Sequence, residues 1–208
     1  MFKSISNWFK ERSEERKRLF KEQLNARASV LEDGKEYDLL YLYKSGFVNP
    51  RATGQSITRI YGEIENLIEK KLNVIIEPGT YFVANGNFQN MVTREDYSVS
   101  LYPNSTARVT IDAACINANL PIPGERDRFS GVNRVSNDLT QFLIASTNAD
   151  RMTVQAGVWA ITDNYTGEAV KAHLVSVDQY GNRHQAVSDR HIDEARRILR
   201  KIGVQTRL

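Results

Sequence analysis

The sequence predicts an α+β fold with an N-terminal amphipathic helix, an antiparallel β-sandwich of immunoglobulin-like size and a C-terminal helical half packed on the sandwich. Three observations predict it. Residues 4–29 contain neither Gly nor Pro. Short apolar segments separated by turn residues then follow one another up to residue 119, and near the C-terminus apolar residues recur at helical spacing. We therefore divide the chain into a basic helical arm (1–33), a sandwich (34–119) and a mainly helical half (120–208).

The segment 4–29 is expected to be a helix with apolar ends and a charged middle. Residues 1–28 carry eight Lys or Arg and four Glu, a net charge of +4, whereas the remaining 180 residues carry about −1. Such a helix can touch its own body at one end and a partner at the other. The alternative is a solvated helix stabilised by opposite charges three or four residues apart. The expected partner-binding residues are Trp8, Phe9, Arg12, Arg16, Lys17, Arg18 and Phe20.

The prediction of a sandwich is based on short segments that have the composition of strands. Tyr97, Val99 and Leu101 alternate with polar residues, the period-two pattern of a half-buried strand, and Pro78-Gly79 suits a type II turn. The segment lacks the Cys…Trp…Cys pattern of true immunoglobulin domains. The expected strand segments are Tyr37–Tyr43, Ser56–Leu67, Leu72–Ile76, Tyr81–Ala84, Tyr97–Tyr102 and Ala107–Ile111.

Helical periodicity returns in the last third of the chain. The segments Asp138–Ala145 and Thr153–Thr162 are expected to be helices, each with an apolar side. A final helix, 189–202, follows Ser188 as N-cap and precedes Gly203, where a C′ glycine belongs. We expect this helix to be part of the core because five apolar residues share its inner side: Ile192, Ala195, Ile198, Leu199 and Ile202.

Composition narrows the class of protein. Apolar residues make up 41% and charged residues 25%, as in ordinary globular chains. No apolar run approaches the ~20 residues that cross a bilayer, and no signal-peptide pattern is present, so we expect a cytoplasmic protein. The single Cys115 fits a reducing compartment. A net charge of +3 is too small to argue for nucleic acid, which we do not expect as a partner.

Motifs for metal, cofactor or hydrolytic chemistry are missing. His173, His184 and His191 lie apart in the chain, and the lone cysteine has no partner for a zinc site. The loop 163–168 lacks the spacing of a calcium-binding loop. Neither a phosphate-binding loop nor a Gly-x-Ser-x-Gly elbow occurs. We expect a protein without metal or cofactor and without enzymatic activity.

One short motif points to different chemistry. The stretch Val154–Asp163 reads Val-Gln-Ala-Gly-Val-Trp-Ala-Ile-Thr-Asp and resembles the Thr-Gln-x-Ala-Ile-Trp motif of the thioester domains in Gram-positive surface adhesins. This resemblance, carried from Gln155 to Asp163, implies that a cysteine thiolate and the glutamine condense with loss of ammonia, forming a thioester that captures an amine. The reacting pair would be Cys115 and Gln155, with Trp159 as a wall of the pocket.

Three functions follow as alternatives. The first is an interaction or assembly protein, in which a rigid body carries a basic helical arm that binds a protein partner or a second copy. The second is the thioester-type covalent binder. The third is association with a membrane surface through residues 1–24, which the four glutamates of that segment oppose because anionic lipid repels them. We expect the first, with Cys115 as a free thiol and Gln155 and Trp159 buried together on one helix face.

Overall fold

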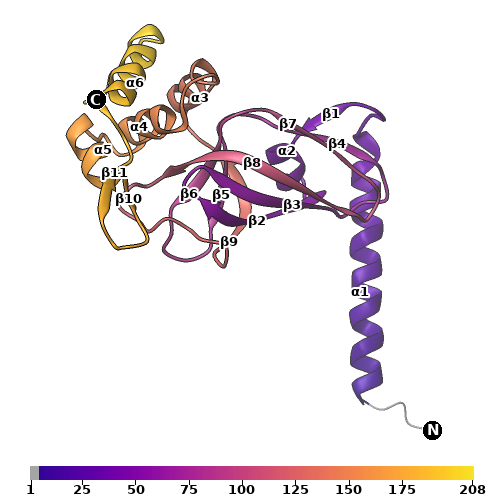
Figure 1. Ribbon diagram of the computed structural model, residues 1–208. Coiled ribbons are helices and arrows are strands. Elements are labelled where there is room, and N and C mark those ends of the chain that lie inside the picture. Colours follow the sequence, from indigo (N-terminus) through magenta and orange to yellow (C-terminus); the bar gives the residue numbers. More distant parts are fainter. Residues whose placement is uncertain (1–4) are drawn as a thin grey trace.

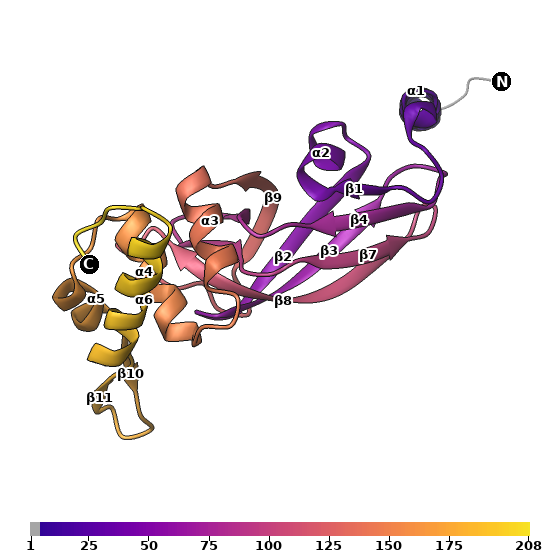
Figure 2. The same cartoon turned by 90° about the horizontal axis from the view of Figure 1, so that it is seen from above.

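The computed structural model describes the backbone of residues 5–208 and the side chains of residues 9–176 and 178–208. A β-barrel forms the centre of the molecule, a helical region covers one end, and an N-terminal helix projects from the other end (Figures 1 and 2). The helices are α1 (Ile5–Arg27), η1 (Ala28–Val30, a 3-10 turn), α2 (Leu39–Lys44), α3 (Asn137–Ala145), α4 (Arg151–Thr162), α5 (Gly167–His173) and α6 (Asp189–Lys201). The strands are β1 (Glu36–Asp38), β2 (Val48–Ser56), β3 (Arg59–Asn66), β4 (Leu72–Ile76), β5 (Thr80–Ala84), β6 (Asn90–Thr93), β7 (Tyr97–Leu101), β8 (Thr106–Ile116), β9 (Arg128–Arg134), β10 (Val175–Val177) and β11 (Arg183–Gln185).

The β-sandwich predicted from the sequence is wrong, because the main sheet closes on itself. Its strands follow the order β2-β3-β8-β6-β5-β9, and β9 pairs with β2 to complete a barrel in which every neighbouring pair is antiparallel. Alternation of apolar and polar residues is the same in a strand of a sandwich and in a strand of a barrel. The local pattern therefore predicts strands but does not determine which architecture they build.

The closing strand, β9, lies in the segment 120–208 that we expected to be mainly helical. It pairs with β2 through Arg51–Thr53 and with β5 through Thr80–Ala84. Its Phe129 and Val132 point into the barrel core. The barrel therefore extends past residue 119, and the helical region begins only with α3.

The predicted strand Tyr37–Tyr43 is also incorrect, because only Glu36–Asp38 is extended and α2 follows directly. The Asp38 carboxylate accepts a hydrogen bond from the Tyr41 backbone N–H at 3.0 Å and so caps the helix. Leu39 and Leu42, three residues apart, are both fully buried. This spacing buries two leucines from one side of a helical turn, whereas in a strand they would point to opposite faces.

The buried residues form two apolar clusters on either side of the barrel wall. The first fills the barrel interior, including Ile60, Ile64 and Ile111, and extends under a second sheet, in which β4 lies between β1 and β7. The second lies between the outer surface of β6 and β8, at Val92 and Ala114, and helices α3, α4 and α6. The strand β8 thus contributes side chains to both clusters.

Three predicted helices are confirmed. The segments Asp138–Ala145 and Thr153–Thr162 correspond to α3 and α4, and the final helix corresponds to α6. On α6, Gly203 follows the helix with a φ of 76°, the left-handed conformation expected at that position. Four of the five residues expected on its inner side are buried, namely Ile192, Ala195, Ile198 and Leu199, whereas Ile202 follows the helix as C-cap and is only partly buried.

Candidate functional site

Most of α1 stands clear of the body (Figure 1). Its last turn and the following η1 are anchored, since Leu24 and Ala28 belong to the barrel-side cluster and the Asn25 side chain accepts a hydrogen bond from Glu69 N–H at 2.8 Å. Before this turn, residues 9–22 are exposed or only half-buried, and we call them the arm. The predicted contact between α1 and its own body is therefore limited to its C-terminal part, where Lys21 at the end of the arm also lies 3.5 Å from Glu69.

Three large apolar side chains of the arm face solvent, and one of them is Leu19, which is 46% exposed. Phe9 is 58% exposed and Phe20 is 62% exposed. Spacings of three and four residues place Phe9, Arg12, Arg16 and Phe20 on one side of the helix. The spacing is visible in the sequence. The prediction of two separate apolar ends missed it, because Phe9 and Phe20 belong to one continuous side of the helix.

The other predicted partner-binding residues of the arm are arranged differently. Lys17 pairs with Glu14 at 3.0 Å, and Arg18 lies 3.7 Å from Glu22. Both are exposed pairs within the helix, of the kind that contributes a few tenths of a kcal/mol to helix stability. Trp8 lies outside the residues whose side chains are described. The predicted set thus divides into one mixed apolar and basic side and two locally neutralised cations.

The structure brings Cys115 and Gln155 together. Gln155 lies on α4 and Cys115 on β8, and both are fully buried. The Gln155 Oε1 accepts a hydrogen bond from Cys115 N–H at 2.9 Å, and its Nε2 donates to the Cys115 carbonyl at 2.7 Å. The glutamine amide thus makes the pair of bonds that a neighbouring strand would make.

The position of this contact along β8 explains it. The pairing of β3 with β8 ends at Asp112, and Ala113 N–H still reaches Thr58 O at 2.9 Å. Beyond that point β3 no longer covers this edge, and α4 takes its place. Gln155 bonds the N–H and the C=O of Cys115. Asp163, at the end of α4, accepts a hydrogen bond from Ala118 N–H at 3.1 Å. The side chains of Gln155 on α4 and of its C-cap Asp163 thereby occupy the hydrogen-bonding edge that β3 leaves open.

The thiol of Cys115 points elsewhere. Its Sγ lies 3.0 Å from the Sδ of Met91 on β6, and burial raises the pKa of the thiol far above its usual range. A thiol in this apolar environment is unreactive, because the thiolate is the nucleophile. Trp159, one helical turn after Gln155, is also buried, as expected for the same helix face.

A charged cluster joins the barrel to the start of α4. Asp112 on β8 accepts hydrogen bonds from Arg151 at 2.7 Å and from Arg59 at 3.4 Å. Burial favours the neutral carboxyl, but the hydrogen bonds and charges of these two arginines outweigh it and lower the pKa of Asp112. Arg94 is buried beside them, and this desolvation lowers the pKa of its guanidinium group. This cluster orients α4 against the barrel.

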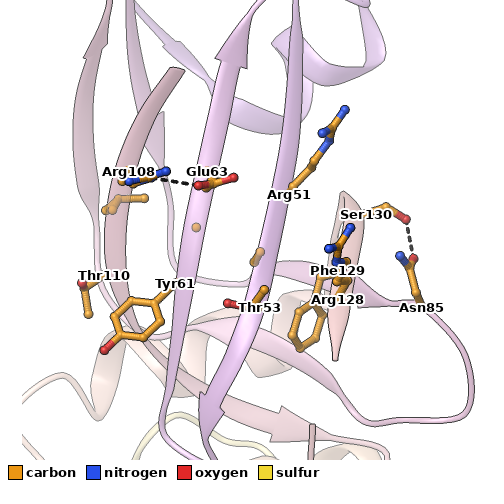
Figure 3. A pocket seen from close by; sticks show the side chains of 13 residues that line it. Arg51, Thr53, Tyr61, Glu63, Asn85, Arg108, Thr110, Arg128, Phe129 and Ser130 are labelled. Carbon is orange, nitrogen blue, oxygen red and sulfur yellow. Dashed lines mark hydrogen bonds and ion pairs between the residues drawn. The ribbon is translucent and has the colours of Figure 1, made fainter. Parts of the chain in front are cut away.

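A feature that sequence reasoning missed is a groove of about 650 Å³ on the outer surface of β2, β3, β8 and β9 (Figure 3). Three arginines and one exposed tyrosine line it: Arg51, Arg108, Arg128 and Tyr61. The polar alternation along β3 and β8 was visible in the sequence. Neither β2 nor β9 was expected, so nothing indicated that four strands would share this face.

Among the residues that the structure describes, no three His, Cys, Asp or Glu side chains are grouped so that they could hold a metal ion. No helix within residues 5–208 combines the length and apolar character needed to cross a bilayer.

Comparison of the chain with protein-family models, with curated proteins and with solved structures finds no match. The arm, the Cys115–Gln155 contact and the groove are therefore the features from which a function can be inferred.

Proposed function

We propose that this protein is a non-enzymatic interaction or assembly protein, in which the barrel and helical region form a rigid body and the arm binds a protein partner. One observation carries the proposal: Phe9 and Phe20 are both more than half exposed on one side of a helix that projects from the body (Figures 1 and 2). Exposed aromatic side chains grouped on a protruding element are typical of surfaces that a partner covers.

The charges of the arm suggest the chemistry of the partner surface. Arg12 and Arg16 lie between the two phenylalanines, on the side that would enter a groove, as amphipathic helices do in helix-in-groove recognition. Glu11, Glu15 and Glu22 follow one another at spacings of four and seven residues, which places them on a different side. A partner with an apolar groove bordered by acidic residues fits this arrangement best. A second copy fits less well, because pairing two arms along this side would bring Arg12 and Arg16 of one copy close to the same arginines of the other.

Binding of the arm to a membrane surface is less favoured than binding to a protein. The cations of the arm are interleaved with glutamates, and Lys17 and Arg18 already pair with Glu14 and Glu22 within the helix. Anionic lipid attracts unpaired Lys and Arg but repels carboxylates. Only the cations between the phenylalanines would face the lipid.

The test is to place a photo-crosslinking amino acid at Ser13, between the two phenylalanines, and to cross-link the full chain in its source cells. The double variant Phe9→Ser/Phe20→Ser should give at least tenfold less cross-linked product than the natural chain, because both apolar anchors are gone. Its free energy of unfolding should change by less than about 0.5 kcal/mol, since exposed positions contribute little to folding. The affinity of the partner thus identified is then measured for the purified natural chain and for the purified double variant.

The matched control is Ile144→Ser, which removes an apolar side chain that is 57% exposed on α3. It should cross-link like the natural chain. Equal cross-linking by the Phe9/Phe20 variant would refute binding through the arm. A cross-link to a second copy, with a dimer in sedimentation velocity, would identify self-association. Co-sedimentation with phosphatidylserine vesicles that depends on Phe9 and Phe20 would favour the membrane alternative.

A second candidate function, covalent capture through a thioester, is favoured by the contact between Cys115 and Gln155. Three features oppose it: the amide of Gln155 is fully engaged by the Cys115 backbone, Sγ lies against Met91, and burial raises the thiol pKa. We therefore infer a structural role for the pair.

Intact mass decides between these roles. The natural chain should have the mass of its sequence, because a free thiol and an intact amide lose nothing. A thioester would leave it lighter by one ammonia, and Cys115→Ala would abolish that deficit. Finding the deficit would replace the assembly proposal with covalent binding.

A further inference from the structure

The groove on the barrel is built from two rows of outward-facing side chains. Strand register places Ser130, Arg51, Glu63 and Arg108 side by side across β9, β2, β3 and β8. The same register places Arg128, Thr53, Tyr61 and Thr110 in the neighbouring row. The intervening residues, such as Ala52 and Phe129, point into the core. Both rows therefore lie on one outer face, and Figure 3 shows their side chains above the same sheet.

Positive charge exceeds negative charge in this groove. Of its three arginines, Arg108 pairs with Glu63 at 2.9 Å, whereas Arg51 lies 3.9 Å from Glu65 at the margin. Arg128 has no ion pair or side-chain hydrogen bond among the residues that the structure describes. The chain outside residues 1–28 carries a net charge of about −1, so the concentration of arginines here is local. Guanidinium groups bind phosphate in a planar, bidentate geometry.

The rest of the groove offers a stacking surface and neutral hydrogen-bonding groups. Tyr61, near the centre of its row, is 43% exposed, and its hydroxyl accepts a hydrogen bond of 2.5 Å from Gln55 Nε2, which fixes the ring. Thr53 and Thr110 flank it in the row. At the edge, Ser130 donates to Asn85 at 2.5 Å. An exposed, oriented aromatic ring among cations is the arrangement on which nucleic-acid bases stack.

We propose that this groove binds a nucleotide, with the phosphate held by Arg51 and Arg128 and the base stacked on Tyr61. Neighbouring strands lie about 4.8 Å apart, so four strands span about 14 Å, enough for a base, a sugar and a phosphate. An acidic peptide would use the arginines but would leave the tyrosine without a role. The nucleotide can be free or part of a single strand, and both present the same phosphate and base. This site is separate from the arm and independent of its partner.

The experiment measures binding of a fluorescein-labelled thymidine single strand of about 12 nucleotides by anisotropy at about 50 mM salt, and of UMP by calorimetry. Each of Arg51→Gln and Arg128→Gln should weaken binding of the strand several-fold. Each should also lower the slope of log K against log salt by about 0.7, the value for one phosphate contact on a single strand. Tyr61→Leu should weaken binding about tenfold while leaving that slope unchanged, because it removes stacking but no charge.

Two matched controls separate the groove from general electrostatic attraction. Arg183→Gln removes one exposed positive charge on β11 and should leave affinity unchanged. Arg12→Gln/Arg16→Gln removes two charges from the arm and should also have no effect. If UMP binds and the Arg51, Arg128 and Tyr61 substitutions weaken its binding as they weaken binding of the strand, the ligand is a free nucleotide. If only the strand binds, the ligand is a nucleic acid.

Three results would overturn the proposal. One is absence of binding by both probes at low salt. Another is loss of binding in the arm variant with retention in the groove variants. The third is equally tight binding of a hexaglutamate peptide that is unaffected by Tyr61→Leu, which would show that the groove recognises negative charge alone. All the altered side chains are exposed, so circular dichroism should confirm that every variant is folded.

Discussion

Replacing Gln155 with leucine should destabilise the protein by about 4 kcal/mol, because it leaves the buried N–H and C=O of Cys115 without partners, at about 1–3 kcal/mol each. The side chain keeps its approximate volume, so loss of packing contributes little. The measurement is urea unfolding followed by circular dichroism. Gln141→Leu, the same change at an exposed position on α3, is the matched control and should shift stability by less than about 0.5 kcal/mol. A loss that small at Gln155 would contradict the structural role.

Gln155→Glu distinguishes hydrogen bonding from packing at the same position. A protonated carboxyl can accept from Cys115 N–H and donate to its carbonyl, as the amide does, whereas the ionised carboxylate cannot donate and is buried at a cost. Burial raises the pKa of the glutamate in the folded state above its unfolded value of about 4.3. The stability deficit relative to the natural chain should therefore be smallest below about pH 4.3 and should grow as pH rises through the folded pKa.

Replacing Gly157 with alanine should destabilise the protein by about 2–3 kcal/mol, the usual cost of overpacking a core. On propensity alone the change would stabilise α4 by about 1 kcal/mol, because alanine is the better helix former. The opposite sign is expected because a Cβ at this position would overlap the ring of Phe142 on α3. The glycine thus permits the close approach of the two helices, and thermal unfolding measures the loss.

A double-mutant cycle tests that explanation. Phe142→Leu alone should destabilise the core by leaving a small cavity, but in its presence Gly157→Ala should cost much less than in the natural chain. A coupling energy of about 1–2 kcal/mol is expected for two side chains in direct contact. Additive effects of the two substitutions would show that the glycine serves another purpose.

The short motif around Gln155 has a structural explanation in this chain. The resemblance to thioester domains rests on a glutamine four residues before a tryptophan, on a helix that follows the cysteine. Here that spacing aligns the glutamine amide with a strand edge and buries Trp159 in the helical cluster. The motif drew attention to Cys115 and Gln155, and the fold shows that the hydrogen bonds of Gln155 run to the backbone of Cys115 and not to its sulfur.

Local patterns in the sequence were enough to predict several elements of the fold. The periodicity of α6, the apolar sides of α3 and α4 and the alternation along β7 and β8 each follow from side chains a few residues apart, which fix the backbone conformation. The sequence also indicated an exposed basic arm, because its charges and apolar residues are unevenly placed. Local pattern failed at α2, where Leu39 and Leu42 are buried together on a short helix that Asp38 caps.

The way these elements combine depends on contacts between residues that are distant in the chain. Closure of the barrel depends on β9 pairing with β2, whose partner residues Ala52 and Phe129 are far apart in the chain, and such pairing leaves no local periodic signal. The same closure aligns Arg51 and Arg128 on one outer face and so creates the groove. The departure of β3 from β8 after Asp112 leaves a strand edge that Gln155 satisfies. Each of these features brings together residues that are distant in the sequence. Each is stabilised by burial and hydrogen bonding that exist only in the assembled fold.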